Sequence, residues 1–157
     1  MSRYIPKLLR QRIMVEARGL CTYCRTAVVN TGARFVIDHI IPESLGGETV
    51  WENLCLACHT CNEFKGVTTE TTDPMTGEVV PLFHPKNQRW HENFAWNQDH
   101  SRIFGLTPVG RATISVLNMN HPERRSTCPY PPHPARFRRI GRGLARRCTF
   151  CGRSGGQ

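Results

Sequence analysis

The sequence lacks any apolar run long enough to cross a membrane as a helix. Its apolar residues stand in short groups along 157 positions, whereas a spanning helix needs about 20 of them in succession. The N-terminal segment 1–7 is mostly polar and basic, and Arg10, Gln11 and Arg12 interrupt the apolar residues that follow, so the pattern of a secretion signal is missing as well. These two absences predict a soluble cytoplasmic protein without a membrane partner.

Acidic residues are scarce, and the scarcity is concentrated at one end of the chain. The net charge is +9, but residues 1–120 hold 12 basic against 11 acidic side chains, while residues 121–157 hold nine Arg and only Glu123 as an acid. That tail also contains five Pro and five Gly, with few large apolar residues. Its composition predicts a largely disordered basic segment with affinity for polyanions, and it says little about the folded part.

The chain divides into three predicted parts, and its hydrophobic content of 39% can fill only a small core. The parts are a core over 1–70, an accessory extension over 71–120 and the basic tail over 121–157. Leu8, Leu9, Ile13 and Ala17 recur at helical spacing near the N-terminus. The aromatic residues Trp90, Phe94 and Trp96 are predicted core anchors. In the first part, local patterns predict a helix with Pro6 at its first position and Gly19 at its stop, and a strand at 35–37. Helical turns with a cysteine knuckle are predicted over 50–65, with a helix at 59–65. The extension is predicted to contain a hairpin over 71–83, a strand at 103–106, and a helix that is capped by Thr107 and ends near Leu117.

Eight cysteines stand out, and six of them form Cys-x-x-Cys pairs. Without a secretion signal, this spacing favours metal binding over disulfides. Cys21 and Cys24 form the first pair, and Cys58 and Cys61 form the second after 33 intervening residues. Four thiolates suit a tetrahedral zinc ion, and a closed four-cysteine site is structural. We therefore expect a structural Zn²⁺ that holds together a domain too small to be stabilised by burial alone.

Other interpretations of the cysteines remain open. The two pairs can be ordinary reduced thiols or a redox pair, and His59 can in principle replace one cysteine. Cys55 is expected to be a small buried core residue. The tail residues that offer a second, weaker zinc set are Cys128, His133, Cys148 and Cys151.

An ordered set of polar and turn-forming residues is interleaved with the cysteine pairs. Its members are Asp38-His39-Ile40-Ile41-Pro42, Gly46-Gly47, Asn53-Leu54, Asn62 and Lys65. Together with the cysteines, this pattern resembles the HNH endonuclease family, in particular its zinc-stabilised, stand-alone bacterial type. The resemblance covers Cys21 to Gly66, which is under a third of the chain.

The resemblance implies an α+β fold with a ββα-metal core, in which two strands and a helix surround one divalent ion. His39 matches the family's general base, which activates the attacking water. Asn53 matches the middle residue, which ties the intervening loop in place. Asn62 matches the third signature position and would bind the catalytic ion together with Asp38. The family's reaction is hydrolysis of DNA phosphodiester bonds, leaving 5′-phosphate and 3′-hydroxyl ends.

The chemistry of these residue types agrees with those roles. Phosphodiester hydrolysis needs an activated water and a cation to offset the developing charge, and an imidazole is a suitable base near neutral pH. One carboxylate and one amide oxygen are hard ligands that suit Mg²⁺. The soft thiolates would therefore select zinc at one site, and the oxygen ligands would select magnesium at the other.

The expected site makes demands on geometry. Neighbouring residues of a strand point to opposite faces, so Asp38 and His39 share a site only if the strand ends or bulges there. Asn62 and Lys65 are three apart on the predicted helix, which puts them on one face, with Lys65 near a substrate phosphate. The cations that could touch the DNA backbone elsewhere are Arg25, Arg34 and Lys86.

Taken one at a time, these residues have ordinary structural roles. Asp38 or Asn53 can cap a helix, His39 can be a satisfied histidine, and Lys65 can be a solvated charge. One alternative function is a non-catalytic, zinc-stabilised nucleic-acid-binding module. Another is a structural zinc protein that docks onto a protein partner. Neither alternative needs Asp38, His39 and Asn62 in register, and the sequence identifies no DNA target and no partner that would supply one.

Overall fold

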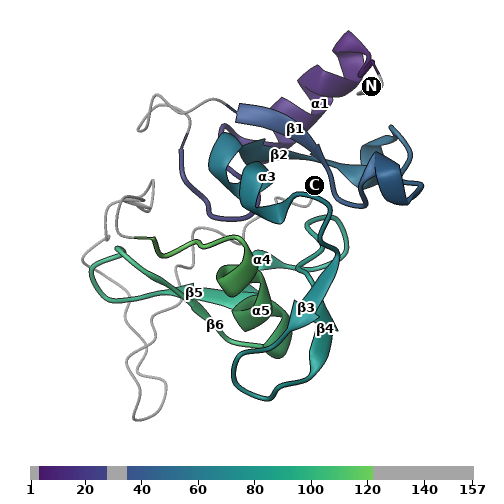
Figure 1. The fold of residues 1–157 in the computed structure, drawn as a ribbon. Coiled ribbons are helices and arrows are strands. Elements are labelled where there is room, and N and C mark those ends of the chain that lie inside the picture. The colour runs from purple at the N-terminus through teal and green to yellow at the C-terminus, as the bar shows by residue number, and fades with distance from the viewer. Residues whose placement is uncertain (1–3, 28–34, 122–157) are drawn as a thin grey trace.

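The structure is a computed structural model that describes residues 4–27 and 35–121 (Figure 1). The predictions made for Arg34, for the tail from Pro122 onward and for its cysteines lie outside the described residues. Within them, no helix combines the length and apolar character that crossing a membrane requires.

The described chain folds into short helices and three two-stranded antiparallel sheets, which confirms the predicted α+β class. Figure 1 shows β1, β2 and α3 side by side above the extension. The elements of the N-terminal half are α1 (Lys7–Ala17), β1 (Phe35–His39), the 3-10 turns η1 (Glu43–Leu45) and η2 (Trp51–Asn53), β2 (Leu54–Cys58) and α3 (His59–Lys65). Those of the extension are β3 (Glu70–Thr72), β4 (Val79–Pro81), α4 (Trp90–Asn93), β5 (Phe94–Trp96), β6 (Ile103–Gly105) and α5 (Pro108–Val116).

Strands β1 and β2 pair in regular register, from Phe35 opposite Cys58 to His39 opposite Leu54. The prediction of helical turns throughout 50–65 was therefore wrong for Leu54–Cys58. All five residues of β2 are buried, so the strand shows no alternation of apolar and polar residues that local pattern could detect. Its pairing with β1, which is distant in sequence, determines its conformation.

Helix α1 covers one face of the β1–β2 sheet. Ile13 is 1% exposed and packs with Leu54 and Leu56 of β2. Leu9 and Ala17 join this cluster, whereas Leu8, which shares their helical spacing in sequence, is 80% exposed.

The ends of α1 differ slightly from the prediction. Pro6 is the N-cap rather than the first helical residue, and the helix ends at Ala17, two positions before Gly19. Arg18 takes a left-handed conformation as C-cap, and its N–H donates to the carbonyl of Val15. Gly19 follows Arg18 with a φ of 69°, so the glycine predicted to stop the helix stands directly after its C-cap.

The extension confirms the predicted hairpin, the strand near 103–106 and the helix capped by Thr107. The Thr107 hydroxyl accepts a hydrogen bond from the N–H of Gly110, which is the expected N-cap contact. Gly110 also allows close packing, because a Cβ there would lie 2.1 Å from the carbonyl oxygen of Asn93. Helix α5 therefore rests directly on the backbone at the end of α4.

One hydrophobic cluster runs from the cysteine pairs into the extension. Trp90, Phe94 and Trp96 are buried in it, as predicted, beside Cys58 and Cys61. The Trp90 indole N–H also donates to the carbonyl oxygen of Tyr23, at 2.7 Å. The segment 1–70 and the extension 71–120 thus share a continuous core.

A buried ion pair closes the extension. Arg111 of α5 donates to both carboxylate oxygens of Asp73, at 2.9 and 2.6 Å, and Asp73 is fully buried. Asp73 also accepts hydrogen bonds from the backbone N–H groups of Met75 and Thr76 in the hairpin turn. The hydrogen bonds from Arg111 hold the pKa of the Asp73 carboxyl well below its usual range. This carboxylate therefore joins the turn to α5.

Substitution Asp73→Asn should lower the free energy of unfolding at pH 7 and flatten its dependence on acid pH. Because the folded-state pKa of Asp73 is depressed, its contribution is complete above the unfolded-state pKa of about 3.9 and is lost as the pH falls through the folded-state value. Urea unfolding between neutral and acid pH measures this, with Glu70→Gln, an exposed carboxylate on β3, as the control. Equal pH slopes in the wild type and Asp73→Asn would contradict the assignment.

Candidate active site and metal centre

The four predicted zinc ligands come together in the structure. The sulfur atoms of Cys21, Cys24, Cys58 and Cys61 all lie within 4.8 Å of one another, and all four residues are buried. Cys58 ends β2 and caps α3, accepting a hydrogen bond from the N–H of Cys61. Cys21 and Cys24 lie in the turn after α1, which an isolated bridge between Leu20 and Ala27 closes. The cluster therefore joins segments separated by more than thirty residues.

The spacing of the sulfur atoms fits zinc. The Sγ atoms of Cys24 and Cys58 are 3.8 Å apart, and a tetrahedral ion with Zn–S bonds of about 2.3 Å places its sulfur ligands about 3.8 Å from one another. Hydrogen bonds from Cys21 and Cys24 lower the pKa of the Cys58 thiol, whereas burial raises that of Cys21. The cluster is therefore a candidate zinc site, and a bound Zn²⁺ would hold these four residues as thiolates.

Two neighbours of the cysteine pairs lie outside this cluster. The His59 side chain is 58% exposed and lies 3.7 Å from the Glu63 carboxylate. Cys55 is a buried core residue, and burial raises the pKa of its thiol to about 12. Cys55 lies outside the group of four sulfur atoms and packs in the core, as the sequence led us to expect.

Asp38 lies on the sheet face that looks toward the cysteine cluster. Its Oδ2 accepts a hydrogen bond from the hydroxyl of Tyr23 at 2.7 Å, and its Oδ1 accepts one from the ammonium of Lys65 at 3.1 Å. The residue is only 6% exposed. Burial raises the pKa of Asp38, and the positive charge of Lys65 and the hydrogen bond from Tyr23 oppose that rise. Its surroundings thus fix the carboxylate on two sides.

Lys65 is an interior residue with an exposure of 2%. Besides its contact with Asp38, its ammonium donates to the carbonyl oxygen of His39 at 2.8 Å. One side chain of α3 therefore holds both Asp38 and His39, at the end of β1. The sequence led us to expect Lys65 near a substrate phosphate, and the structure instead points its charge into the protein.

His39 faces away from Asp38, because the register stays regular through the last residue of β1. Its Nε2 lies 3.0 Å from the hydroxyl of Thr49 and 3.9 Å from the carboxylate of Glu43. The imidazole is 11% exposed. Asp38 and His39 therefore contact different side chains, and the strand ends at His39 without a bulge.

Asn53 holds the loop between the two strands. Its Oδ1 accepts from the N–H of Ile41, and its Nδ2 donates to the carbonyl oxygens of Ile41 and Glu48. Gly47 allows this close approach, since a Cβ there would lie 1.8 Å from the carbonyl oxygen of Ile41 and 2.8 Å from Asn53 Nδ2. The hydrogen bonds fix both ends of the loop that carries Glu43.

Asn62 lies on α3, one turn before Lys65, and is half-buried. Among the described residues, none is recorded as a hydrogen-bond partner of its side-chain amide. Each carboxylate oxygen of Asp38 retains capacity for a further ligand beyond its one short hydrogen bond. The oxygen atoms of Asp38 and Asn62 are therefore ligands of the type that a hard divalent ion prefers. Lys65 already places one positive charge beside Asp38.

Three residues of this region were not singled out in the sequence. Tyr23 lies inside the first Cys-x-x-Cys pair, and its position next to Cys24 gives no sign that its hydroxyl reaches Asp38. Thr49 and Glu43 belong to the loop between the strands, and the loop's folding back onto β1 brings them to His39. Only contacts across the fold reveal these three.

We expect the purified protein to carry one zinc ion at this cluster and to lose its fold when that ion is removed. Cys24→Ser should abolish stoichiometric zinc binding and lower the thermal midpoint, because the cluster joins the segment after α1 to α3. Elemental analysis and thermal melts measure both. The control variant Cys55→Ala removes a buried cysteine outside the cluster and should retain zinc. If Cys55→Ala lost zinc as Cys24→Ser does, the assignment of the four ligands would be refuted.

Lys65→Met should destabilise the fold by about 3–5 kcal/mol, because it leaves the Asp38 carboxylate buried without its partner. The double variant Lys65→Met with Asp38→Asn should recover a large part of that loss. Urea unfolding of the two single variants and the double variant gives the coupling energy. Additive losses would show that the two side chains are energetically independent.

The comparisons with known proteins agree with this site. Residues 21–73 match the family model described as HNH endonuclease. No curated protein and no solved structure matches the chain. The matched segment contains the four clustered cysteines and every residue of the candidate active site. HNH endonucleases are nucleases, so the family implies a nucleic acid as the class of substrate. Residues 21–73 are therefore similar to the HNH endonuclease family.

Proposed function

We propose that this protein is a metal-dependent DNA endonuclease that hydrolyses phosphodiester bonds, with His39 as the general base. The observation that carries the proposal is the assembly of β1, β2 and α3 within the segment that matches the HNH family. Asp38 and His39 end β1, and Lys65 of α3 donates hydrogen bonds to the Asp38 carboxylate and to the backbone carbonyl of His39. Asn62 lies one turn before Lys65 on the same helix.

The surroundings of His39 suit a proton acceptor. Its imidazole is largely shielded but still reaches the surface, as a base that must meet a water molecule requires. When the ring takes a proton from the attacking water, it becomes an imidazolium. The Glu43 carboxylate, 3.9 Å from Nε2, would stabilise that charge. The Thr49 hydroxyl orients the ring through the same nitrogen.

Asp38 and Asn62 would hold the catalytic divalent ion through a carboxylate and an amide oxygen. Such an ion, Mg²⁺ by the chemistry of these donors, supplies positive charge for the phosphate and the leaving oxygen. Tyr23 and Lys65 keep the Asp38 carboxylate in one orientation. Asn53 keeps the loop that carries Glu43 and Thr49 in place. The family's products, with 5′-phosphate and 3′-hydroxyl ends, are the expected products here.

Cleavage of supercoiled plasmid tests the proposal. The wild type should nick or linearise it with Mg²⁺ or Mn²⁺ but not with EDTA. His39→Ala should lower the rate by about 100-fold or more, which is the contribution typical of a general base. His59→Ala is the control, because this histidine is exposed on α3 and lies outside the cysteine cluster, and it should cut at the wild-type rate.

The outcome also decides between the nuclease and the binding module. Zinc content and thermal midpoint must match among the variants, so that a change in rate reports chemistry. If the wild type binds zinc and DNA but cuts under no divalent ion, the nuclease proposal fails and the non-catalytic module takes its place. If His39→Ala cuts as fast as His59→Ala, His39 is not the base.

A further inference from the structure

One positive charge already stands beside the carboxylate that is the proposed ligand of the catalytic ion. The Lys65 ammonium lies 3.1 Å from Oδ1 of Asp38, in a salt bridge whose two side chains are 2% and 6% exposed. The same ammonium donates a hydrogen bond to the carbonyl oxygen of His39 at 2.8 Å. Lys65 therefore contributes to the charge of the site itself, and its ammonium is held there by two contacts with the end of β1.

Any ion bound to Asp38 would have to share the carboxylate with Lys65. Oδ2 of Asp38 accepts a hydrogen bond from the Tyr23 hydroxyl at 2.7 Å, and Oδ1 accepts one from Lys65. A carboxylate oxygen can take more than one ligand, so neither contact by itself blocks a metal ion. The hydrogen bond from Tyr23 is neutral, whereas Lys65 brings a full positive charge. Of the two contacts, the one with Lys65 is therefore the one that opposes a second cation.

The charges at Asp38 balance for one cation of unit charge. Among the residues that the structure describes, Asp38 is the only carboxylate recorded in contact with the Lys65 ammonium. Asn62, the other proposed ligand, is neutral. A divalent ion added beside Lys65 would leave an excess of positive charge where water hardly reaches, and like charges repel strongly in such a place. The ion and the ammonium therefore oppose each other's binding to Asp38.

We infer that Lys65 is the resident cation of the Asp38 carboxylate when the catalytic site holds no ion, and that a divalent ion binds there by displacing the Lys65 ammonium. The inference rests on the proposed metal-dependent nuclease and concerns how its site takes up the ion. A buried carboxylate needs a partner of opposite charge whenever the ion is absent, and Lys65 supplies it. The ammonium stands on a flexible four-carbon chain, which lets it leave the carboxylate without a change of backbone. Lys65 thus stabilises the empty site and lowers its affinity for the ion.

Binding of Mn²⁺ to the full-length, zinc-loaded protein without DNA tests the inference. Free Mn²⁺ is measured by electron paramagnetic resonance, and Asp38→Asn identifies the binding that depends on the carboxylate. Lys65→Gln removes the charge and leaves an amide that can still donate hydrogen bonds. It should bind Mn²⁺ about 10-fold more tightly than the wild type, because no ammonium has to be displaced. Mn²⁺ should also raise the thermal midpoint of Lys65→Gln by more than that of the wild type.

Two further variants separate the effect of charge from that of packing. Lys65→Arg retains the positive charge and should bind Mn²⁺ no more tightly than the wild type. Tyr23→Phe removes the neutral hydrogen bond to the other oxygen of Asp38, and it should not tighten binding either. Equal affinity in Lys65→Gln and the wild type would overturn the inference. The same tightening in Tyr23→Phe as in Lys65→Gln would overturn it too, because any loosening of the carboxylate would then suffice.

Acetylation of lysine side chains gives a second measurement that needs no variant. Lys65 is buried, whereas Lys7 on α1 is exposed and serves as the internal reference. Mn²⁺ at a concentration that saturates the Asp38-dependent binding should raise the acetylation of Lys65 relative to Lys7, as measured by mass spectrometry of the peptides. Unchanged acetylation of Lys65 would overturn the inference, and this holds even if Lys65→Gln fails to fold.

The outcomes distinguish this inference from the proposed function. If Lys65→Gln binds Mn²⁺ more tightly but the wild type cuts DNA with no divalent ion, the nuclease proposal fails and the competition at Asp38 stands. If the wild type cuts DNA and the two proteins bind Mn²⁺ equally, the nuclease proposal stands and the inference fails. Mn²⁺ binding that is the same in Asp38→Asn as in every other protein would also overturn the inference, since no ion would then compete for Asp38.

Discussion

The buried ion pair between Lys65 and Asp38 is the contact on which the candidate active site depends. Removing two charges from water is costly, and an interior pair persists only when further hydrogen bonds complete it. Here the Tyr23 hydroxyl donates a hydrogen bond to the Asp38 carboxylate, and the Lys65 ammonium donates one to the carbonyl oxygen of His39. A single side chain of α3 thereby fixes the last two residues of β1. The orientation of the site is thus set from inside the protein rather than by its surface.

The cysteine cluster provides the frame for that ion pair. Cys58 caps α3, the helix that carries Asn62 and Lys65, and Tyr23 stands between Cys21 and Cys24. A zinc ion at the cluster would therefore fix the start of α3 and the position of the tyrosine hydroxyl together. The candidate zinc site and the Asp38 carboxylate are therefore linked through Tyr23.

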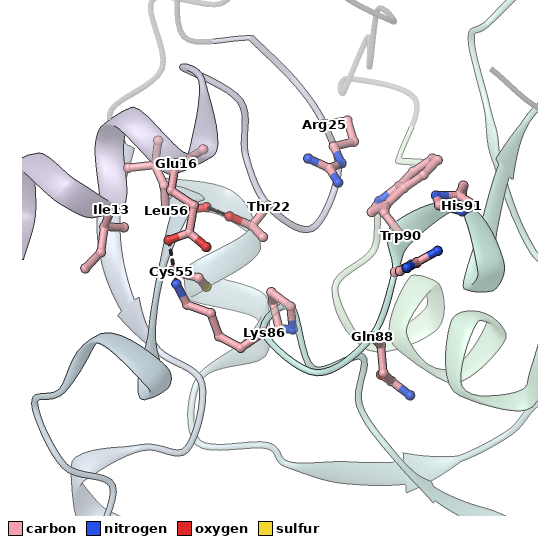
Figure 2. Close-up of a pocket in the computed structure, with 13 residues that line it drawn as sticks. Ile13, Glu16, Thr22, Arg25, Cys55, Leu56, Lys86, Gln88, Trp90 and His91 are labelled. Carbon is pink, nitrogen blue, oxygen red and sulfur yellow. Dashed lines mark hydrogen bonds and ion pairs between the residues drawn. The ribbon is translucent and has the colours of Figure 1, made fainter. Parts of the chain in front are cut away.

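The extension beyond α3 contributes more than added core. Its aromatic residues bury the cysteine cluster, and the hydrogen bond from Trp90 to Tyr23 reaches the same turn that supports Asp38. The segment that leads into Trp90 also forms one wall of a cavity that α1 and β2 line on the other side (Figure 2). Packing of the extension on residues 21–73 therefore creates this cavity, and neither part forms it alone.

Much of this protein was determined by local sequence. The spacing of the cysteine pairs predicted the cluster, local pattern predicted the helix at 59–65, and Thr107 before Pro108 predicted the start of α5. These features depend on neighbours within a few residues. The ordered pattern of polar residues and cysteines also pointed to the family whose model matches residues 21–73.

Tertiary structure alone decided the rest. The strand conformation of Leu54–Cys58 depends on β1, and the burial of Lys65 depends on Asp38, which lies 27 positions earlier. The opposite orientations of Asp38 and His39 follow from a regular register. No local signal encodes these outcomes, because each depends on a partner that is close in space and remote in sequence.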